Sequence, residues 1–418
     1  MSALASGLLA AAADDLPGFA WLDGGAEGRS FAGVEVDASI EAEDLEALDE
    51  VDRAWRAAPE RLWIGWVTYD LGASTLLGRR PRPGRLRGLV FRRYRAGVEF
   101  DGGALRWHGE AAAIDALRRR VAGRRVEEPG AWPWGALAPV SEPSAHRRRV
   151  SAILERIAAG DTYQVNLSQV LRASWRRRPA DREALARAVA GAYGRLRAAT
   201  PASMGGLLAA DDAWILSNSP ETLFDVRLGR GATGDRMRTW PIKGTRPRGP
   251  DPAADRRAAA ELLACAKERA EHLMIVDLLR NDLGRLARPG SVVAPRVPTL
   301  VSLPTVHHLV SEVACELRPG WTLRSLFTAL FPGGSITGAP KRRTVEIIDS
   351  LEDHRRGIYC GAIVVLEPGG IRASIPIRTA IVDRDGLELC SGGGIVADSD
   401  PEAERVETLV KARAFDPR

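Results

Sequence analysis

The sequence predicts an α/β protein of the α+β type, in which strands and helices do not follow one another as regular βαβ repeats. Residues 62–72 form an apolar run that ends in glycine, which favours a buried strand. Residues 162–168 alternate polar and apolar side chains, as a half-buried strand does. Residues 144–159 instead carry apolar side chains at helical spacing and are followed by Gly160.

The composition is that of a globular protein without a membrane segment. Of 418 residues, 45% are hydrophobic and 27% are charged, which is ordinary for a chain with one large core or several domains. The apolar run at residues 8–13 is too short to span a membrane and is followed by Asp14 and Asp15. The net charge of +5 is mild, and the arginine clusters lack interleaved aromatic residues, so we expect no nucleic-acid partner and no membrane partner.

The four cysteines argue for a reducing environment. They stand far apart and form no C-x-x-C pair, which is unlike both a zinc site and a disulfide framework. We therefore expect a cytoplasmic protein.

A segment rich in Pro, Gly and Trp at residues 129–143 is the best internal boundary. Residues 1–143 are predicted to be rich in strands, with helices at residues 41–58 and 111–123 and a partner for the first strand at residues 89–100. This part contains no Lys, Asn or Gln. We expect it to pack into one unit with residues 144–418, which hold the functional site.

Lysine is rare, and its placement points to chemistry. Only four of the 59 Lys and Arg residues are lysine: Lys243, Lys267, Lys341 and Lys411. Arginine keeps its proton in proteins, whereas lysine can serve as a free amine nucleophile or as a compact ammonium. Lys243 lies in the sequence PIKGT at residues 241–245, and by residue type alone a surface lysine in a turn is the simpler interpretation.

Acidic residues recur at helical spacing in two later segments. A long helix is predicted from Asp251 to residue 283, and a last helix is predicted to begin after Asp400. Glu pairs three residues apart lie on one face of each helix: Glu268 with Glu271, and Glu404 with Glu407. Such pairs are usually solvated, but two helices that converge could hold a divalent ion such as Mg²⁺ through oxygen ligands.

Two glycine-rich segments and a histidine pair are further candidates. Residues 331–341 lack the Lys-Ser/Thr ending of a P-loop, so we do not expect nucleotide binding there. Residues 392–394 are three glycines, which we expect to expose backbone N–H groups suited to an anion. His307 and His308 are adjacent on a predicted strand, so at most one of them faces any given site.

Together these motifs resemble the chorismate-utilising enzymes, a family that includes anthranilate, aminodeoxychorismate, isochorismate and salicylate synthases. The resemblance runs from about residue 144 to residue 415. It is carried, in order, by residues 160–168, 219–221, 241–245, 267–271, 275–282, 331–341 and 392–396. It implies two stacked antiparallel β-sheets flanked by helices, with the active site in the cleft.

Two positions resemble one branch of this family. Lys243 is similar to the lysine of aminodeoxychorismate synthases, where anthranilate synthases carry alanine. Gln164 occupies a position where isochorismate and salicylate synthases carry a water-activating lysine. The resemblance therefore implies amination of chorismate at C4 to 4-amino-4-deoxychorismate, for para-aminobenzoate and folate synthesis. The alternatives are an anthranilate synthase, or the same amination in specialised metabolism.

The resemblance also implies roles for individual residues. Lys243, Glu221 and His308 would be catalytic; Glu271 and Glu407 would bind Mg²⁺, supported by Glu268 and Glu404; and the substrate would be held by Gln164, Thr245, Tyr359, Arg378, Gly392, Gly393, Gly394 and Lys411. None of the four cysteines lies in a G-x-C-x-G elbow, so we expect ammonia to come from a separate glutamine amidotransferase subunit or from solution.

Overall fold

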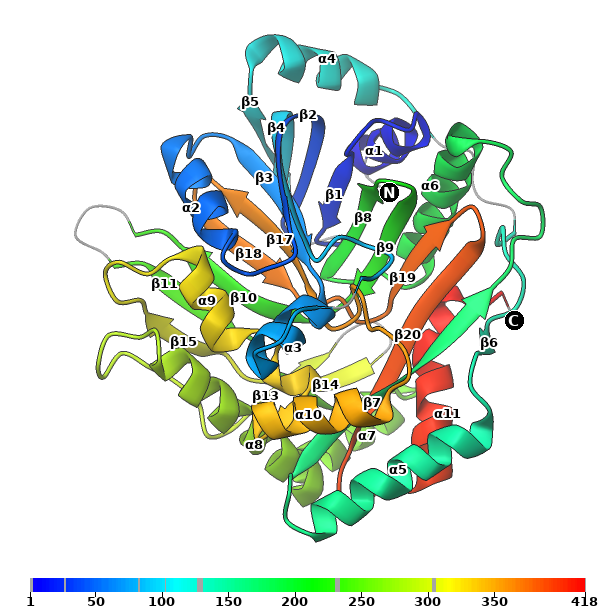
Figure 1. The fold of residues 1–418 in the computed structure, drawn as a ribbon, viewed down its shortest axis with the longest axis vertical. Helices are drawn as coiled ribbons and strands as arrows, with labels where there is room; N and C mark the ends of the chain where they lie inside the picture. The colour runs from blue at the N-terminus through cyan, green and yellow to red at the C-terminus, as the bar shows by residue number, and fades with distance from the viewer. Residues whose placement is uncertain are drawn as a thin grey trace.

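In the computed structural model, strands from both ends of the chain join one antiparallel sheet that folds over into two layers (Figure 1). The structure describes residues 3–25, 28–81, 83–101, 103–125, 131–229, 234–302 and 306–417. Residues 129 and 130 of the predicted connector lie outside these ranges.

The strands are β1 (Ala20–Asp23), β2 (Ser30–Ala42), β3 (Leu62–Val67), β4 (Leu89–Asp101), β5 (Ala104–Gly109), β6 (Ala138–Pro139), β7 (Gln164–Ala173), β8 (Met204–Ala210), β9 (Ala213–Ser219), β10 (Thr222–Arg227), β11 (Arg236–Thr239), β12 (Ile242–Pro247), β13 (Thr299–Ser302), β14 (Val306–Val310), β15 (Val313–Glu316), β16 (Gly338–Ala339), β17 (Ala362–Glu367), β18 (Gly370–Ser374), β19 (Thr379–Asp383) and β20 (Gly386–Ile395). The helices are α1 (Ala3–Ala13), α2 (Leu48–Ala57), α3 (Tyr69–Leu77), α4 (Ala111–Val121), α5 (Pro143–Ala158), α6 (Arg182–Ala199), α7 (Pro252–Ala264), α8 (Ala266–Gly284), α9 (Leu323–Leu330), α10 (Lys341–Leu351) and α11 (Pro401–Ala412), with short 3₁₀ turns η1 (Gly334–Ile336) and η2 (Arg413–Phe415).

The pairing of the strands is antiparallel throughout the described residues and continuous from one layer to the other. The order is β15-β11-β10-β18-β17-β3-β4-β2-β1-β8-β9-β19-β20-β7. The predicted pair of stacked antiparallel sheets is confirmed, with hydrogen bonds that link the two layers at their shared strands. Because β3 pairs with β17, residues early in the chain border strands that come near its end.

Side chains that alternate along each strand build two kinds of core. In β3, Leu62 and Ile64 pack between the layers, together with Ile363 of β17. The intervening Trp63 points to the opposite face of the sheet, into a second core that also contains residues of α2, α8 and α9. This period of two is expected for strands that are buried on both faces.

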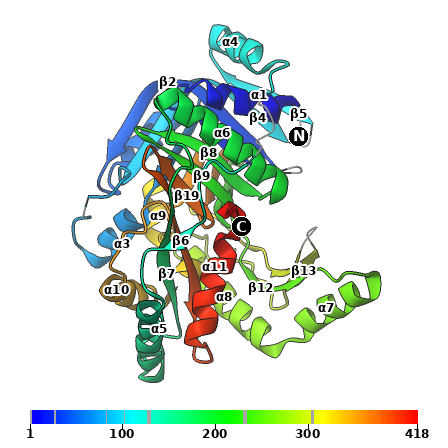
Figure 2. The same cartoon turned by 90° about the vertical axis from the view of Figure 1, so that its right-hand side faces the viewer.

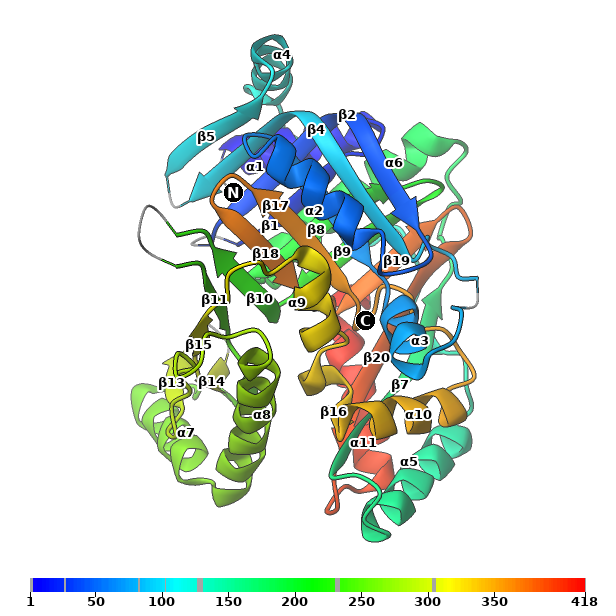
Figure 3. The same cartoon turned by 60° about the vertical axis from the view of Figure 1, so that its left-hand side comes forward.

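A separate sheet of β12, β14 and β13 stands beside the main one and packs against α7 and α8. Figures 2 and 3 show these elements on one side of the molecule, while β7, β20, α5, α10 and α11 lie on the other. None of the helices in the described residues is both long enough and apolar enough to cross a membrane.

Several predicted elements are confirmed, and three need correction. The predicted helices at residues 111–123 and 144–159 correspond to α4 and α5, and the predicted partner strand at residues 89–100 is β4, paired with β3. The predicted strand at residues 62–72, however, ends at Val67, and α3 begins at Tyr69. Because α3 is itself buried, its sequence is apolar on most sides and does not show a helical period.

The other two corrections concern helix boundaries. The helix predicted at residues 41–58 spans only Leu48–Ala57, because β2 continues to Ala42. The long helix predicted from Asp251 to residue 283 is two helices, α7 and α8, which meet at Cys265, whose ψ of 107° is not helical. Neither glycine nor proline marks this break, so the sequence pattern could not reveal it.

The interlayer core generates a prediction about stability. Ile363 is 1% exposed, and its replacement by alanine removes apolar contacts from both layers. We expect Ile363→Ala to lower the free energy of unfolding by about 2–5 kcal/mol. Leu105→Ala, at a side chain that is 51% exposed, should change it by less than about 0.5 kcal/mol. Denaturant unfolding followed by circular dichroism measures both, and equal shifts would contradict the assigned core.

Candidate active site

Glu221 lies between β9 and β10, where backbone and side-chain contacts fix it. Its N–H donates to Ser219 Oγ over 3.2 Å, and its carbonyl accepts from the N–H of Ile375 over 3.0 Å. Ser335 Oγ, in the turn η1, donates to Glu221 Oε1 over 2.5 Å. The carboxyl group is thus held by a hydroxyl from a segment more than one hundred residues away.

The environment of Glu221 favours the protonated acid. Withdrawal from bulk water raises its pKa above the usual carboxyl range, although the hydrogen bond from Ser335 opposes this shift. The charges of Lys243, Lys411 and Arg378 also act to lower the pKa. Because all three charges influence its pKa, Glu221 is the carboxyl group that Lys243, Lys411 and Arg378 have in common.

Lys243 differs from the other three lysines in its contacts. Lys341 pairs with Asp282 at 2.9 Å, Lys267 with Asp398 at 3.6 Å, and Lys411 with Glu407 at 2.6 Å; these pairs account for every lysine except Lys243. Within the described residues, the side chain of Lys243 makes no hydrogen bond and no ion pair, although its backbone pairs with Leu309 of β14. The residue is half-buried, and its amine is not engaged by a permanent counter-ion in the described residues.

A bulge in β12 sets the position of Lys243. The register with β14 shifts between Lys243, opposite Leu309, and Thr245, opposite His308. The extra residue is Gly244, whose φ of +76° lies in the left-handed region that favours glycine. The PIKGT sequence thus encodes a local kink as well as an amine.

The two predicted histidines face different partners, as expected for neighbours on a strand. His308 Nδ1 lies 2.9 Å from Thr245 Oγ1, and burial together with the charge of Arg378 lowers the pKa of His308. His307 instead lies 3.0 Å from Asp255 of α7. His308 is therefore the histidine on the side of Arg378.

His272 of α8 is a neighbour of Lys243 that the motif reading missed. It is buried, its Nε2 lies 2.7 Å from Ser311 Oγ, and both burial and the charge of Lys243 lower its pKa. His272 directly follows the predicted ligand Glu271, which is the only signal in the sequence that could have drawn attention to it.

The three glycines are not a free loop but the end of β20, paired with β7. Asn166 and Ser168 of β7 direct their N–H groups away from β20, to Thr337 O and to Glu352 Oε1. The residues opposite them, Gly394 and Gly392, therefore form non-hydrogen-bonded pairs and turn their own N–H groups away from β7. No described strand pairs with that edge beyond residue 389, so these two N–H groups are available.

Gly393 corrects the prediction that all three glycines offer N–H groups. Its place opposite Leu167 makes it a hydrogen-bonded partner of β7. What it supplies is space, because a Cβ there would lie 2.9 Å from Glu404 Oε2.

The faces of the two flanking glycines are lined by polar groups. A Cβ on Gly392 would lie 2.7 Å from the Tyr359 hydroxyl and 3.0 Å from Asn166 Oδ1. A Cβ on Gly394 would lie 3.0 Å from Gln164 Nε2. Both amide atoms of Gln164, and Oδ1 of Asn166, are buried without a hydrogen-bond partner in the described residues. Unpaired buried amides are costly, so these groups are suited to a polar ligand.

The predicted acids converge from α8 and α11. Burial raises the pKa of Glu404, and the charges of Glu407 and Glu271 raise it further, which places acids of both helices near one another. Glu404 accepts a hydrogen bond from Ser399 Oγ at 2.5 Å. Glu268, in contrast, is paired with Arg246 at 3.1 Å and lies beside the β12 bulge.

These acids fit a magnesium ion only as a partial set of ligands. Within the described ranges, no three or more His, Cys, Asp or Glu side chains form a group that could hold a metal by themselves. Mg²⁺ ordinarily takes one or two carboxylates and completes its coordination with water and substrate oxygens. The oxygen donors Glu271, Glu404 and Glu407 suit that pattern. Glu407 is paired with Lys411 and Glu268 with Arg246, so a bound ion would compete with these two cations.

Comparisons with known proteins agree with this geometry. Residues 17–417 match the model of a family described as chorismate binding enzyme. The chain is 45% identical over 265 residues to aminodeoxychorismate synthase component 1 of Salmonella typhimurium, covering 63% of this chain and 54% of the relative. It is 43% identical over 268 residues to an anthranilate synthase component 1 of Haloarcula marismortui, covering 64% and 52%.

The fold agrees over a longer stretch than the sequence does. The solved anthranilate synthase component I of Streptococcus pneumoniae superposes with a TM-score of 0.75 at 26% identity, covering 94% of this chain and 92% of that chain. The chain spans about half the length of the two curated relatives it matches. Since the family model covers nearly all of it, this chain belongs to the family of chorismate-binding enzymes.

Proposed function

We propose that the chain aminates chorismate at C4, using ammonia and Mg²⁺, to give 4-amino-4-deoxychorismate for para-aminobenzoate and folate synthesis. The observation that carries this proposal is an unpaired lysine amine, Lys243, beside a carboxyl group, Glu221, that burial favours in its protonated form. The aminodeoxychorismate synthase name of the Salmonella relative supports the choice of product.

The two groups would act as nucleophile and acid in one displacement. The free amine of Lys243 attacks C2 of the ring, the ring double bond shifts, and the C4 hydroxyl leaves as water with the proton of Glu221. Ammonia then forms the C4–N bond, the double bond shifts back and the C2–N bond breaks, which releases Lys243 as an amine. The new ammonium returns one proton to Glu221, so the sum is chorismate plus ammonia to aminodeoxychorismate plus water.

The remaining residues would bind and orient the substrate. Arg378, Tyr359 and the free N–H groups of Gly392 and Gly394 suit the enolpyruvyl carboxylate. Gln164, Thr245 and Lys411 would contact the substrate, and His308 would stand near the reacting C4.

Glu271 and Glu407 would hold Mg²⁺, with Glu404 and Glu268 supporting them. The ion would neutralise the ring carboxylate when bound. Ammonia would come from a separate glutamine amidotransferase subunit, in keeping with the "component 1" names of the relatives.

Lys243 provides the most direct test. We expect Lys243→Ala to lose several orders of magnitude in rate, and Lys243→Arg to lose as much, because a guanidinium keeps the charge but cannot attack. Lys267→Ala, at an exposed site on α8, should keep wild-type activity. The assay follows aminodeoxychorismate formation from chorismate, ammonium and Mg²⁺ by chromatography. If Lys243→Arg were active, Lys243 could not be the nucleophile. If the wild type made anthranilate, the chain would instead be an anthranilate synthase.

Glu221 makes the reaction depend on pH. Since its pKa is raised, the acid form persists above the usual carboxyl range and is lost as the pH rises through the raised value. We expect kcat to fall along a high-pH limb, and Glu221→Gln to lower kcat by about 10²–10⁴-fold and abolish that limb. A limb that survives in Glu221→Gln would assign the acid to another group.

The magnesium ligands can be tested by titration. Glu271→Gln and Glu407→Gln should each raise the Mg²⁺ concentration for half-maximal activity by at least about 10-fold. Glu402→Gln is the control, because Glu402 lies on α11 but is exposed and paired with Arg147 and Arg405. Calorimetric titration of Mg²⁺ in the presence of chorismate checks the same affinities without turnover, and unchanged values in both ligand variants would contradict the assigned site.

A further inference from the structure

A buried ion pair lies behind the site and belongs to none of the roles above. Arg356 and Glu352 are four residues apart in the segment that follows α10, and their side chains are 1% and 3% exposed. The guanidinium binds the carboxylate in a bidentate manner, with Nε 2.9 Å from Oε2 and Nη2 2.8 Å from Oε1. Exchanging such a pair for apolar residues is often neutral or stabilising, so stability alone gives little reason for it.

Arg356 also donates hydrogen bonds to the backbone of β7 and of the η1 turn. Its Nη2 donates to the carbonyl of Asn166 in β7 over 2.7 Å, and its Nη1 to the carbonyl of Ile336 in η1 over 3.3 Å. Ile336 follows Ser335, the donor to Glu221. The guanidinium also lies 5.8 Å from the ring centre of Tyr359.

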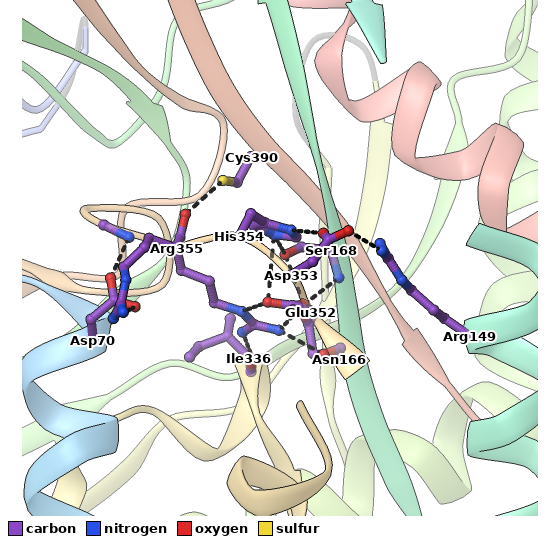
Figure 4. Close-up of polar contacts among 12 residues, drawn as sticks. Asp70, Arg149, Asn166, Ser168, Ile336, Glu352, Asp353, His354, Arg355 and Cys390 are labelled. Carbon is purple, nitrogen blue, oxygen red and sulfur yellow. Dashed lines mark hydrogen bonds and ion pairs between the residues drawn. The ribbon is translucent and has the colours of Figure 1, made fainter. Parts of the chain in front are cut away.

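Glu352 holds the same strand from its side chain. Its Oε1 accepts from both the N–H and the hydroxyl of Ser168, over 2.7 and 2.8 Å. Ser168 lies opposite Gly392, one of the two glycines with a free N–H group. Figure 4 shows Glu352 beside Ser168, with Asn166 and Ile336 on its other flank.

We propose that Arg356 and Glu352 are positioning residues that hold the η1 turn, and through it the Ser335 hydroxyl, against the catalytic acid Glu221, while fixing β7 behind the glycine strand. This inference rests on the proposed function of Glu221. Within the described residues, no hydrogen bond or ion pair joins either side chain to Glu221, and the pair acts through Ser335, Asn166 and Ser168.

The direction of the effect on Glu221 follows from its surroundings. The charged or titratable groups that interact with Glu221 are Lys243 of β12, Lys411 of α11, Arg378 and Cys360. The hydrogen bond from Ser335 lowers the pKa of Glu221. If the η1 turn shifts and that bond lengthens, the pKa of Glu221 rises further. The high-pH limb of kcat then moves to higher pH.

The experiment compares Arg356→Lys with Arg29→Lys. A lysine keeps the charge of Arg356 but cannot make the bidentate contact and both carbonyl bonds at once. Arg29 is a matched control, since it binds Glu99 and Glu367, themselves buried, at a site away from the cleft. Chorismate consumption is followed across pH, whichever product forms, and folding is checked by thermal unfolding.

We expect Arg356→Lys to lower kcat on the order of 100-fold and to move the high-pH limb upward, with little change in KM, while Arg29→Lys leaves kcat and the limb as in wild type. Ser335→Ala should move the limb in the same direction. Adding Arg356→Lys to Ser335→Ala should move it no further, because both act through one contact. If Arg356→Lys does not fold, Ser168→Ala, which removes one bond to Glu352, serves instead and should lower kcat more than Arg29→Lys does.

Two results are decisive against this inference. The pair does not act through Ser335 if the high-pH limb of kcat stays in place or moves to lower pH in Arg356→Lys. The same holds if the shifts of Arg356→Lys and Ser335→Ala add in the double variant. A folded wild type that consumes no chorismate would instead contradict the proposed function.

Discussion

The site depends on a competition at one carboxyl group. Three cations, Lys243, Lys411 and Arg378, act on Glu221 and favour its ionised form, while its withdrawal from water favours the protonated form. Burial is the larger influence. In the proposed reaction this balance matters, because an ionised Glu221 could not donate the proton that the leaving hydroxyl needs.

The fold creates this balance by bringing distant segments together. Glu221 lies between β9 and β10, the Lys243 amine is on β12 of the small sheet, and the Ser335 hydroxyl that donates to Glu221 comes from η1. Strand pairing is continuous through both layers, and the small sheet lies beside them. Helix α8 contacts both the small sheet and β15 of the main sheet. The acids of α8 face those of α11 across the space between the two groups of elements.

Local signals in the sequence predicted much of this correctly. The helix starts predicted at Asp251 and after Asp400 are confirmed, and each aspartate caps its helix by accepting hydrogen bonds from two N–H groups in the first turn. The spacing of Glu404 and Glu407 placed them on one helical face, and adjacency on a strand separated His307 from His308. These features depend on neighbours in sequence, which is why pattern reading reaches them.

What escaped prediction depends on contacts between remote residues. Ser335 lies in the glycine-rich segment at residues 331–341, which was compared with a phosphate loop. Nothing in the sequence of this segment indicates that Ser335 donates a hydrogen bond to the carboxyl group of Glu221. Strand pairing likewise decided that Gly393 turns its N–H toward β7 while its neighbours do not. The helix α3 looked like a strand because its buried residues, Tyr69 and residues 71–74, are nearly consecutive and show no helical period.

The central claim is that the Lys243 amine becomes covalently bound to the substrate. Mass spectrometry of the protein incubated with chorismate and Mg²⁺, without ammonia, tests it most directly. We expect an adduct on the peptide that contains Lys243, with the mass of chorismate less one water. The bound group should be released from the protein when ammonium is added. An adduct on another residue, or full turnover with no adduct under conditions that should trap it, would contradict the account.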